Sequence, residues 1–525
     1  MSFRRIALLA LLVLLPALPV VLAFGRSSGG SAQRWVIAYT PHNEQIRSEF
    51  GRAFAEWHQR NFGEIVKVVW NVPGGASDIR RILQANAEAS LRDGRPIGGN
   101  ADLVFGGGSW EFTQLKREVT VEVAGERRTG RILESPGFEA AWLEGVYGEN
   151  SIGGERLYDP EGYWFGTALS AFGIVYNRDM LLRLGLKEPT QWEDLAHARY
   201  HGALTMVNPS QSASITTALE AILERVGWER GWQIIRRMSA NARSVASSAP
   251  KVSMDVASGD SAAGPTIDFY GRFQAQAILA AGGGDRVGYI DPKGETVVDS
   301  DPVALLAGAP NRETAVRFIR FALSEEGQAL WQFHARKRED GGLGPHEFEL
   351  RRLPILRSFI AARSAEFVDP VDPFTLATAV PDPDRNARAL IAPVFNALCA
   401  DRRDELARAW RAIRTHPAYP RDRALVTAKN VEDAGLKAML AAFDAMPMVD
   451  GPDGARHDLA ERQGRAAVRE GWLRGGWKDA GLWPRVHRAP TNSACGSGSS
   501  SVRSTRRSRE ATHECSQGRD PFGGR

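Results

Sequence analysis

Short apolar runs alternate with amphipathic segments along the first hundred residues of the chain. Residues 35–39, 65–70 and 101–105 are mostly apolar runs with the length of a buried strand. Between these runs, apolar residues recur at intervals of three and four, which is the spacing of one face of a helix. This β-α-β-α-β order predicts a parallel, doubly wound sheet.

The alternation continues beyond residue 160. A long apolar β run covers 163–177, a shorter run covers 202–207, and a further buried strand is expected within 258–270. This last stretch follows a short helical pattern that ends at Gly259, since glycine readily adopts the left-handed conformation found at helix C-termini. Phe269 and Tyr270 are therefore expected at the carboxyl end of a buried strand.

Polar and small residues follow the ends of these strands, which is where open α/β sheets bind their ligands. His42 comes after the first strand, and Gly107, Gly108 and Ser109 come after the third. His42 is either a capping or surface histidine or a residue that faces the crevice. The glycine run is either a flexible loop or a set of backbone N–H groups that hold an anion.

Ser212 and Ser214 lie in a serine-rich turn that opens a helix. Unpaired N–H groups, the helix dipole and the hydroxyls make such a turn an anion site. Ordinary N-capping needs only one serine, so the cluster favours ligand contact. Phe269 and Tyr270 are either core aromatics or ligand contacts, and a phenol can donate a hydrogen bond or bind a hard metal ion.

The two ends of the chain differ from its body. Arg4 and Arg5 precede an apolar run at 6–24, so residues 1–33 are expected to be a signal peptide or an uncleaved membrane anchor with a flexible tether. The body is then exported to the periplasm or another extracytoplasmic space. Residues 485–525 are rich in Ser, Arg and Gly and are expected to be disordered.

Composition excludes several classes of protein. The chain has 66 basic and 62 acidic residues among 525, a balance that does not indicate nucleic-acid binding. Its three cysteines, Cys399, Cys495 and Cys515, supply neither a disulfide framework nor a Cys-based zinc site.

Several segments resemble one known family in their order and spacing. They include Tyr176-Asn177, a Pro189–Leu195 turn, Gly202–Ser214, Ser258–Tyr270, Asp301–Asn311 and Ala315–Gln328. Together they resemble the family-1 extracellular solute-binding proteins of ABC importers, and Phe269-Tyr270 is similar to the tandem tyrosines of the ferric-ion-binding branch.

The resemblance implies a two-lobed periplasmic-binding-protein fold of type II, in which each lobe is a doubly wound α/β sheet. The expected boundaries are 34–168 and 300–345 for the first lobe and 169–299 for the second, with a helical extension that packs on the second lobe at 346–484. Closure about the hinge traps a solute. An inner-membrane permease would receive it, and the receptor is expected to be a monomer without a cofactor of its own.

The ferric branch holds Fe(III) with a histidine, an acidic residue and two tyrosines, aided by an anion. On that pattern His42 and Tyr270 match metal ligands, and Ser212 and Ser214 match the anion turn. Phe269 replaces the first tyrosine, and the glycine run carries no carboxylate. The resemblance therefore implies either ferric iron or an iron chelate as cargo, or a small organic or phosphorylated anion.

An exported enzyme on a similar α/β frame is the competing class. The sequence has no Gly-x-Ser-x-Gly elbow, no His-Glu-x-x-His and no P-loop. His346-Glu347 lacks a second histidine, and Gly282-Gly283-Gly284 lacks the spacing of a dinucleotide-binding loop. A binding protein that does no chemistry on its ligand is the preferred interpretation.

Overall fold

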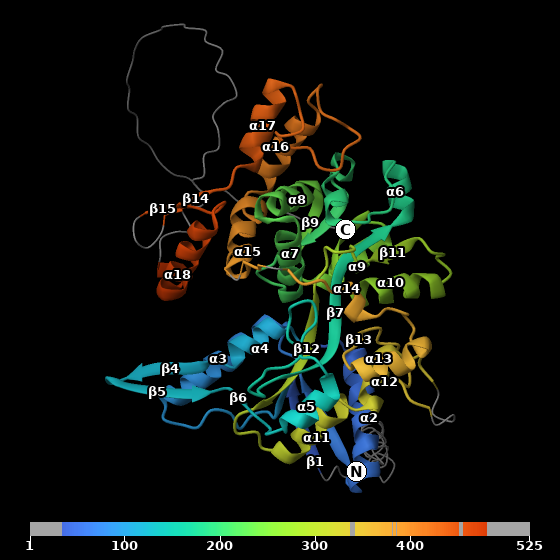
Figure 1. Ribbon diagram of the computed structural model, residues 1–525, viewed down its shortest axis with the longest axis vertical. Helices are drawn as coiled ribbons and strands as arrows, with labels where there is room; N and C mark the ends of the chain where they lie inside the picture. Colours follow the sequence, from blue (N-terminus) through green and yellow to red (C-terminus); the bar gives the residue numbers. More distant parts are fainter. Residues whose placement is uncertain (1–33, 337–341, 381, 385, 451–454, 480–525) are drawn as a thin grey trace, which may run out of the picture.

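The computed structural model describes residues 34–336, 342–380, 382–384, 386–450 and 455–479. The predicted signal peptide or anchor at 1–33 and the predicted disordered tail at 485–525 lie outside these residues. Among the helices that are described, none has both the length and the apolar character needed to cross a bilayer. The chain is a mixed α/β fold built around one mixed sheet (Figure 1).

The N-terminal strands form one end of this sheet. β1 (Arg34–Tyr39) lies between β2 (Val66–Asn71) and β3 (Leu103–Phe105) and pairs in parallel with both. Helices α2 (Glu44–Phe62) and α3 (Ala76–Arg92) connect them, because parallel neighbours need a crossover rather than a tight turn. The predicted β-α-β-α-β order is confirmed.

Two long antiparallel strands connect the halves of the molecule. β7 (Phe165–Asn177) is buried along its whole length, and β12 (Val298–Leu306) pairs with both β7 and β3. The first half of β7 pairs with β12, and its second half pairs with β10 (Ala263–Ile267) and β11 (Val287–Ile290). The chain therefore forms two lobes that share one continuous strand, β7, which runs vertically in Figure 1.

Each lobe has its own hydrophobic core. Along β7, Ala171 belongs to the core of the first lobe and Ile174 to the core of the second, a few residues beyond the boundary predicted at 168/169. In the second lobe, β8 (Leu204–Val207) pairs in parallel with β10 and with β9 (Ala242–Ala246). Its helices are α6 (Arg178–Leu184), α7 (Ala213–Val226), α8 (Trp228–Asn241), α9 (Ala249–Ser258) and α10 (Asp268–Ala280).

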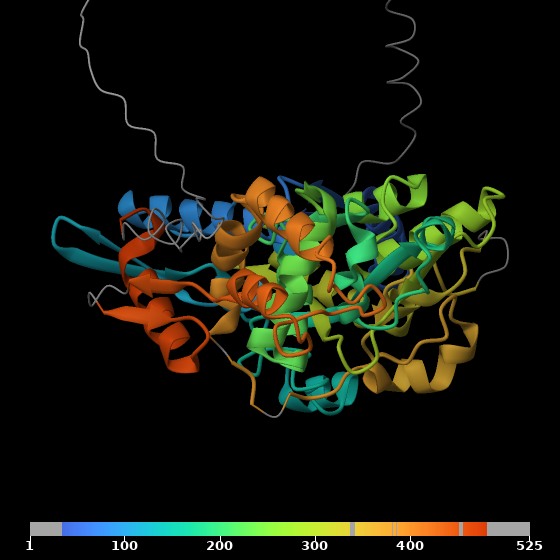
Figure 2. The same ribbon diagram turned by 90° about the horizontal axis from the view of Figure 1, so that it is seen from above.

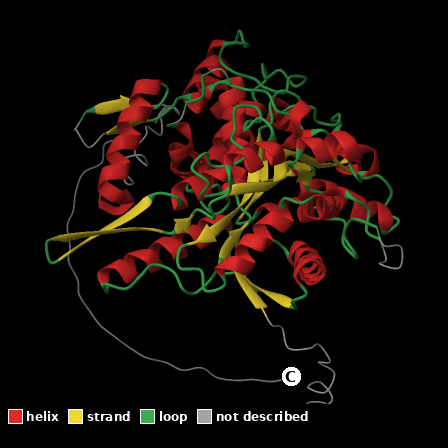
Figure 3. Cartoon of the chain, turned by 60° about the horizontal axis from the view of Figure 1, so that its bottom comes forward, coloured by secondary structure: helices red, strands yellow, loops and turns green. Residues whose placement is uncertain are grey.

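The first lobe carries a hairpin that projects from the body in Figures 1 and 3. It consists of β4 (Glu118–Val123) and β5 (Glu126–Arg131), which form a two-stranded sheet separate from the other described strands. The other elements of this lobe are α4 (Ser109–Leu115), β6 (Leu133–Glu134), α5 (Ala140–Tyr147), α11 (Arg312–Ala322) and α12 (Glu325–Gln332).

The chain stays on the first lobe for longer than expected. β13 (Leu353–Pro354) pairs with β7, and α13 (Arg357–Arg363) buries Phe359 and Ile360 in the first core. The following α14 (Pro373–Leu376) packs against the same core. The expectation that all of 346–484 packs on the second lobe is therefore wrong for its first part, because an apolar edge strand attaches that part to β7.

The remaining C-terminal elements cover the second lobe. They are α15 (Ala387–Phe395), α16 (Arg403–Arg414), α17 (Ala434–Asp444), β14 (Met448–Asp450), β15 (Arg456–Asp458) and α18 (Arg462–Asp479). Helix α15 contributes Leu390, Ile391, Val394 and Phe395 to the second core. Figure 2 shows β14, β15 and α18, coloured red, on the same side of the molecule as the β4–β5 hairpin.

A buried cation fastens this extension to the second lobe. Arg237 on α8 is fully buried and donates two hydrogen bonds of 2.6 and 3.0 Å to the carboxylate of Asp444 on α17. It also donates to the backbone oxygen of Val426, and its guanidinium lies 5.4 Å from the ring centroid of Trp410. Removing one member of a buried ion pair leaves the other charge without a partner, which destabilises the folded state.

Replacing Arg237 with methionine is expected to lower the free energy of unfolding by about 3–5 kcal/mol, because the Asp444 carboxylate loses its charge partner. Urea denaturation followed by circular dichroism measures the loss. The matched control is Arg230→Met on the same helix, where a 55% exposed side chain pairs with Glu193. That control is expected to cost under about 1 kcal/mol. Equal losses in the two variants would contradict the role of Arg237.

Candidate functional site

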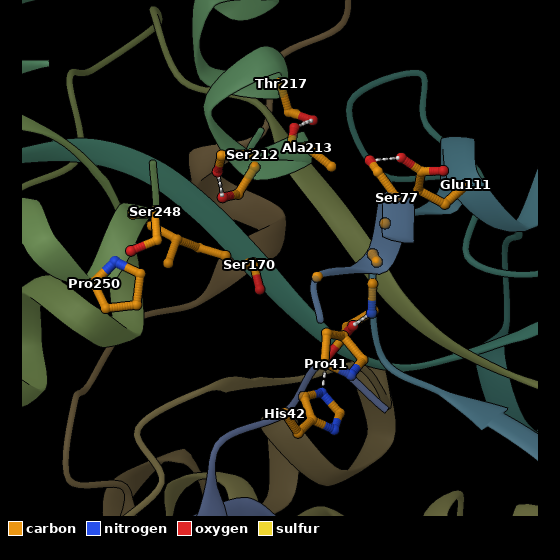
Figure 4. A pocket seen from close by; sticks show the side chains of 18 of the residues that line it. Pro41, His42, Ser77, Glu111, Ser170, Ser212, Ala213, Thr217, Ser248 and Pro250 are labelled. Carbon is orange, nitrogen blue, oxygen red and sulfur yellow. Dashed lines mark hydrogen bonds and ion pairs between the residues drawn. The ribbon is translucent and has the colours of Figure 1, made fainter. Parts of the chain in front are cut away.

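A cavity of about 450 Å³ lies between the two lobes. Figure 4 shows His42 and Ser77 of the first lobe on one side and Ser212 and Ser248 of the second lobe on the other. The lining comes mainly from the turns that follow strands and open helices in both lobes. Both lobes thus direct the carboxyl ends of parallel strands at one cleft, where such folds bind ligands.

The buried strand that was predicted to end at Phe269 and Tyr270 ends earlier than expected. β10 ends at Ile267, and Asp268 begins α10, so Phe269 and Tyr270 lie in the first turn of a helix. Both line the cavity, with ring centroids 4.1 Å apart, and Phe269 is only 6% exposed. Burial raises the pKa of Tyr270 above its usual value, while the nearby Arg352 lowers it.

His42 lines the same cavity and belongs to a buried ionic cluster. Its Nε2 lies 2.8 Å from Oδ2 of Asp301, which lies 2.5 Å from Nη1 of Arg352. Burial lowers the pKa of His42, against the effect of Asp301, so the imidazole is neutral at pH 7. Burial alone would raise the pKa of Asp301, but Arg352 and His42 lower it below its usual value.

Two N–H groups of the glycine run after β3 are already occupied. The N–H of Gly107 donates to Oδ1 of Asp301 over 2.5 Å, and the N–H of Ser109 donates to Oδ2 of Asp299 over 3.3 Å. Gly107 and Gly108 line the cavity, whereas Ser109 is not part of its wall. The prediction that these N–H groups hold an anion is therefore wrong for Gly107 and Ser109, because two carboxylates of β12 already occupy them.

The serine turn before α7 faces the cavity as predicted by its sequence. Ser212 is the N-cap residue but makes no side-chain capping bond, and its hydroxyl lies 3.1 Å from that of Ser214. Both serines line the cavity. The first turn of a 14-residue helix thus keeps its dipole and hydroxyl groups directed at the cleft.

A second serine turn in the same lobe was missed by the sequence reasoning. Ser247 and Ser248 precede α9 and line the cavity beside Ala249 and Pro250, and Ser248 caps the helix without a side-chain bond. The signal was present, since a serine followed by proline in the first turn marks a helix start. The second lobe therefore presents two serine-rich helix N-termini to one cavity.

Three buried polar atoms in the cavity wall have no hydrogen-bond partner among the described residues. They are Nδ1 of His42, Nε of Arg352 and Oδ1 of Asp299. Burial raises the pKa of Asp299 to about 6, although the Ser109 contact opposes this shift. Unsatisfied buried groups are costly, so their concentration around one cavity indicates a place that a polar ligand or water completes.

Two more charged residues of the wall lie far from the predicted ones in sequence. Arg352 and Arg388 come from the C-terminal third of the chain and carry no local motif. Asp299 and Asp301 had a weak signal, because two carboxylates at alternate positions of a buried strand share one face. The two carboxylates reach the loop after β3 because β12 pairs with β3.

The described residues contain no group of three or more His, Cys, Asp or Glu side chains placed to hold a metal ion. His42 is already bonded to Asp301, and the raised pKa of Tyr270 opposes formation of a phenolate. Binding of a metal by His42 and Tyr270 stays a prediction.

Residues 140–336 match the model of a family described as bacterial extracellular solute-binding proteins. This segment includes β7, both serine turns, the start of α10 and the two carboxylates of β12.

Individual relatives are similar over part of the chain. The phosphoglycerate transport regulatory protein PgtC of Salmonella typhimurium is 30% identical over 164 residues, which is 31% of this chain and 39% of PgtC. Iron uptake protein A1 of Synechocystis is 30% identical over 191 residues, 34% of this chain and 49% of that protein. The chain thus matches less than half the length of these relatives.

Among solved structures, the periplasmic binding protein AfuA of Actinobacillus pleuropneumoniae, with fructose-6-phosphate bound, is similar at a TM-score of 0.48. It is 16% identical, and the match covers 72% of this chain and 98% of AfuA.

Asp268 makes stability at this end of the cleft depend on pH. Its carboxyl group is fully buried, and Oδ1 accepts from the Phe269 N–H over 2.8 Å. Burial raises its pKa from 3.8 to about 7, although Arg272 opposes the shift. The folded state therefore keeps a proton that the unfolded chain loses, so this contribution to stability is complete at low pH and is lost as the pH rises toward about 7.

Asp268→Asn is expected to remove this dependence. Between about pH 4 and pH 8, its free energy of unfolding should rise by about 2–4 kcal/mol relative to wild type, as measured by urea denaturation. Asp285→Asn, at a side chain that is 89% exposed, is the control and should show no such change. A constant difference between wild type and Asp268→Asn would show that Asp268 has no raised pKa.

Proposed function

We propose that the protein is a solute-binding receptor of an ABC importer that captures a small phosphorylated organic anion between its lobes. The observation that carries this proposal is the interlobe cavity, which faces two serine-rich helix N-termini, Arg352 and Arg388. Helix N-termini bind phosphate through N–H groups and the dipole. The passage of β7 from one lobe to the other supplies the hinge that closure requires.

The size and chemistry of the cavity favour an organic anion over a bare ferric ion. A volume of about 450 Å³ falls in the range of small-molecule sites. Phe269 cannot ligate a metal, and His42 already binds Asp301. The identity with PgtC, whose name refers to phosphoglycerate transport, supports the same ligand class.

The proposed place of action is the periplasm, where the receptor delivers its solute to a permease and does no chemistry on it. The family model that residues 140–336 match is described as one of extracellular solute-binding proteins, which supports this location. A second candidate role is to report solute occupancy to a membrane-bound regulator, because PgtC is named a transport regulatory protein. Both roles require the same binding step.

Titration calorimetry of the purified protein with 3-phosphoglycerate, fructose 6-phosphate, inorganic phosphate and ferric citrate tests the proposal. Saturable binding of a phosphate ester without its consumption is the expected result. Binding of ferric citrate alone, with a visible phenolate-to-iron absorption, would overturn the ligand class. Conversion of the bound solute to a product would overturn the receptor function.

Tyr270 and Tyr176 form a matched pair for locating the site. Tyr270 lines the cavity, whereas the hydroxyl of Tyr176 donates to Glu188 outside it. Tyr270→Phe is expected to weaken binding of the preferred phosphate ester by about 5- to 30-fold, since one hydrogen bond to a charged group is lost. Tyr176→Phe should change the affinity by less than about twofold. Equal calorimetric losses would place the solute elsewhere.

A further inference from the structure

Arg388 reaches the solute cavity from outside the segment that matches the solute-binding family. That match ends at residue 336, whereas Arg388 lies on α15 in the C-terminal extension. The helix is fixed on the second lobe by the burial of Leu390, Ile391 and Val394 in the second core. The position of Arg388 in the cavity wall is therefore set by a packed helix rather than by a loop.

The side chain of Arg388 contacts both lobes. In the second lobe, its Nη1 donates to Oγ1 of Thr217 over 3.1 Å and to the carboxylate of Glu220, both on α7. In the first lobe, its guanidinium lies 5.1 Å from the ring centroid of Trp110 on α4. Its side chain is 12% exposed, so these contacts hold it in one place at the cleft.

Part of the guanidinium remains available to a ligand. Both hydrogen bonds of Arg388 start from Nη1, and neither Nη2 nor Nε bonds to another described residue. An arginine fork matches a carboxylate through two parallel N–H groups. The open edge therefore has the geometry to receive a planar acid group.

The distance from Arg388 to the serine turn suits one small solute. Thr217, which accepts from Arg388, itself donates to the backbone oxygen of Ala213 in the first turn of α7. The arginine is therefore about one helical turn, roughly 5 Å, along the axis from the turn that holds Ser212 and Ser214. A phosphate on that turn and an acid group two or three carbons away would meet both partners.

We infer that Arg388 is a specificity-determining residue through which the C-terminal extension selects phosphate esters that carry a second acidic group. The inference rests on the proposed function, because it assumes that the serine turns hold the phosphate. It adds that the extension completes the binding site and contacts the solute from the rim shared by the two lobes.

The test compares two probes that differ in one group. 3-Phosphoglycerate carries a phosphate and a carboxylate, whereas glycerol 3-phosphate carries the phosphate and an alcohol. In the full chain, Arg388→Gln is expected to weaken 3-phosphoglycerate binding by about 10- to 100-fold in calorimetry, the effect of losing a charge-assisted hydrogen bond. It should weaken glycerol 3-phosphate binding by less than about threefold, because that probe has no carboxylate to lose.

Two control variants separate ligand contact from a structural role. Arg408→Gln, on α16 of the same extension, changes an arginine whose side chain is 71% exposed and outside the cavity wall, and should leave both affinities unchanged. Glu220→Gln removes the charge that is hydrogen-bonded to Arg388, and 3-phosphoglycerate should then bind as tightly as to wild type or more tightly. Thermal melting of all variants checks that they fold.

The outcomes distinguish the two proposals. If wild type binds both probes and Arg388→Gln weakens them equally, the selection by Arg388 is overturned while the receptor for phosphate esters stands. Loss of 3-phosphoglycerate binding in Glu220→Gln would also overturn it, because the ion pair rather than the open guanidinium edge would then matter. If wild type binds neither probe, the proposed ligand class fails, and the selectivity fails with it.

Discussion

The antiparallel pairing of β7 with β12 is the constraint on which the molecule depends. β7 is the strand that runs through both lobes, β12 pairs with its first-lobe half, and the register of the two strands changes between Asp301 and Pro302. Proline cannot donate to a ladder, so an irregularity at this point is expected. The carbonyl of Thr167 at the same level of β7 accepts side-chain hydrogen bonds from Gln328 and Trp331. The irregularity is thus stabilised from the first lobe.

This pairing also places the chemistry of the cleft. Asp299 and Asp301 alternate along β12 and so point to one face, toward the loop after β3. Asp301 brings together His42, Arg352 and the Gly107 amide, which come from three separate parts of the chain. Gly106 must be a glycine, since a Cβ there would lie 2.5 Å from the imidazole of His42. The register of β12 therefore determines where the charged groups of the cleft lie.

The parts that sequence could predict are those with a local physical cause. Continuous apolar runs identified β1, β7 and β8, and the turns after β1 and β8 identified His42 and Ser212 as cleft residues. The end of the apolar stretch at 258–270 identified Tyr270. The contact of His42 with Asp301 joins residues 259 positions apart, and no periodicity encodes such a pairing.

The errors have equally local causes. Phe269 and Tyr270 belong to a helix rather than a strand because Asp268 starts α10 and Oδ1 of Asp268 accepts the N–H of Phe269. The glycine run suggested free anion donors only because the two carboxylates that fill them lie on a distant strand. Arg388 had no local signal at all, since its role depends on how α15 packs against α7.

The charges of the cleft indicate which groups would provide affinity for an anion and which would provide selectivity. Arg352 is neutralised by Asp301, and Arg388 is neutralised in part by Glu220, so neither arginine offers an uncompensated charge. In the proposed function, attraction of an anion then comes largely from the helix N-termini and hydroxyls of the two serine turns. An arginine that is already paired can still bind an acid group through its free N–H groups, because the geometry of the hydrogen bonds rather than the net charge determines that contact. In the proposed function, the serine turns bind anions in general and Arg388 distinguishes among them. Since Arg388 belongs to the extension, the proposed discrimination comes from a part of the chain that lies beyond the family-matched region.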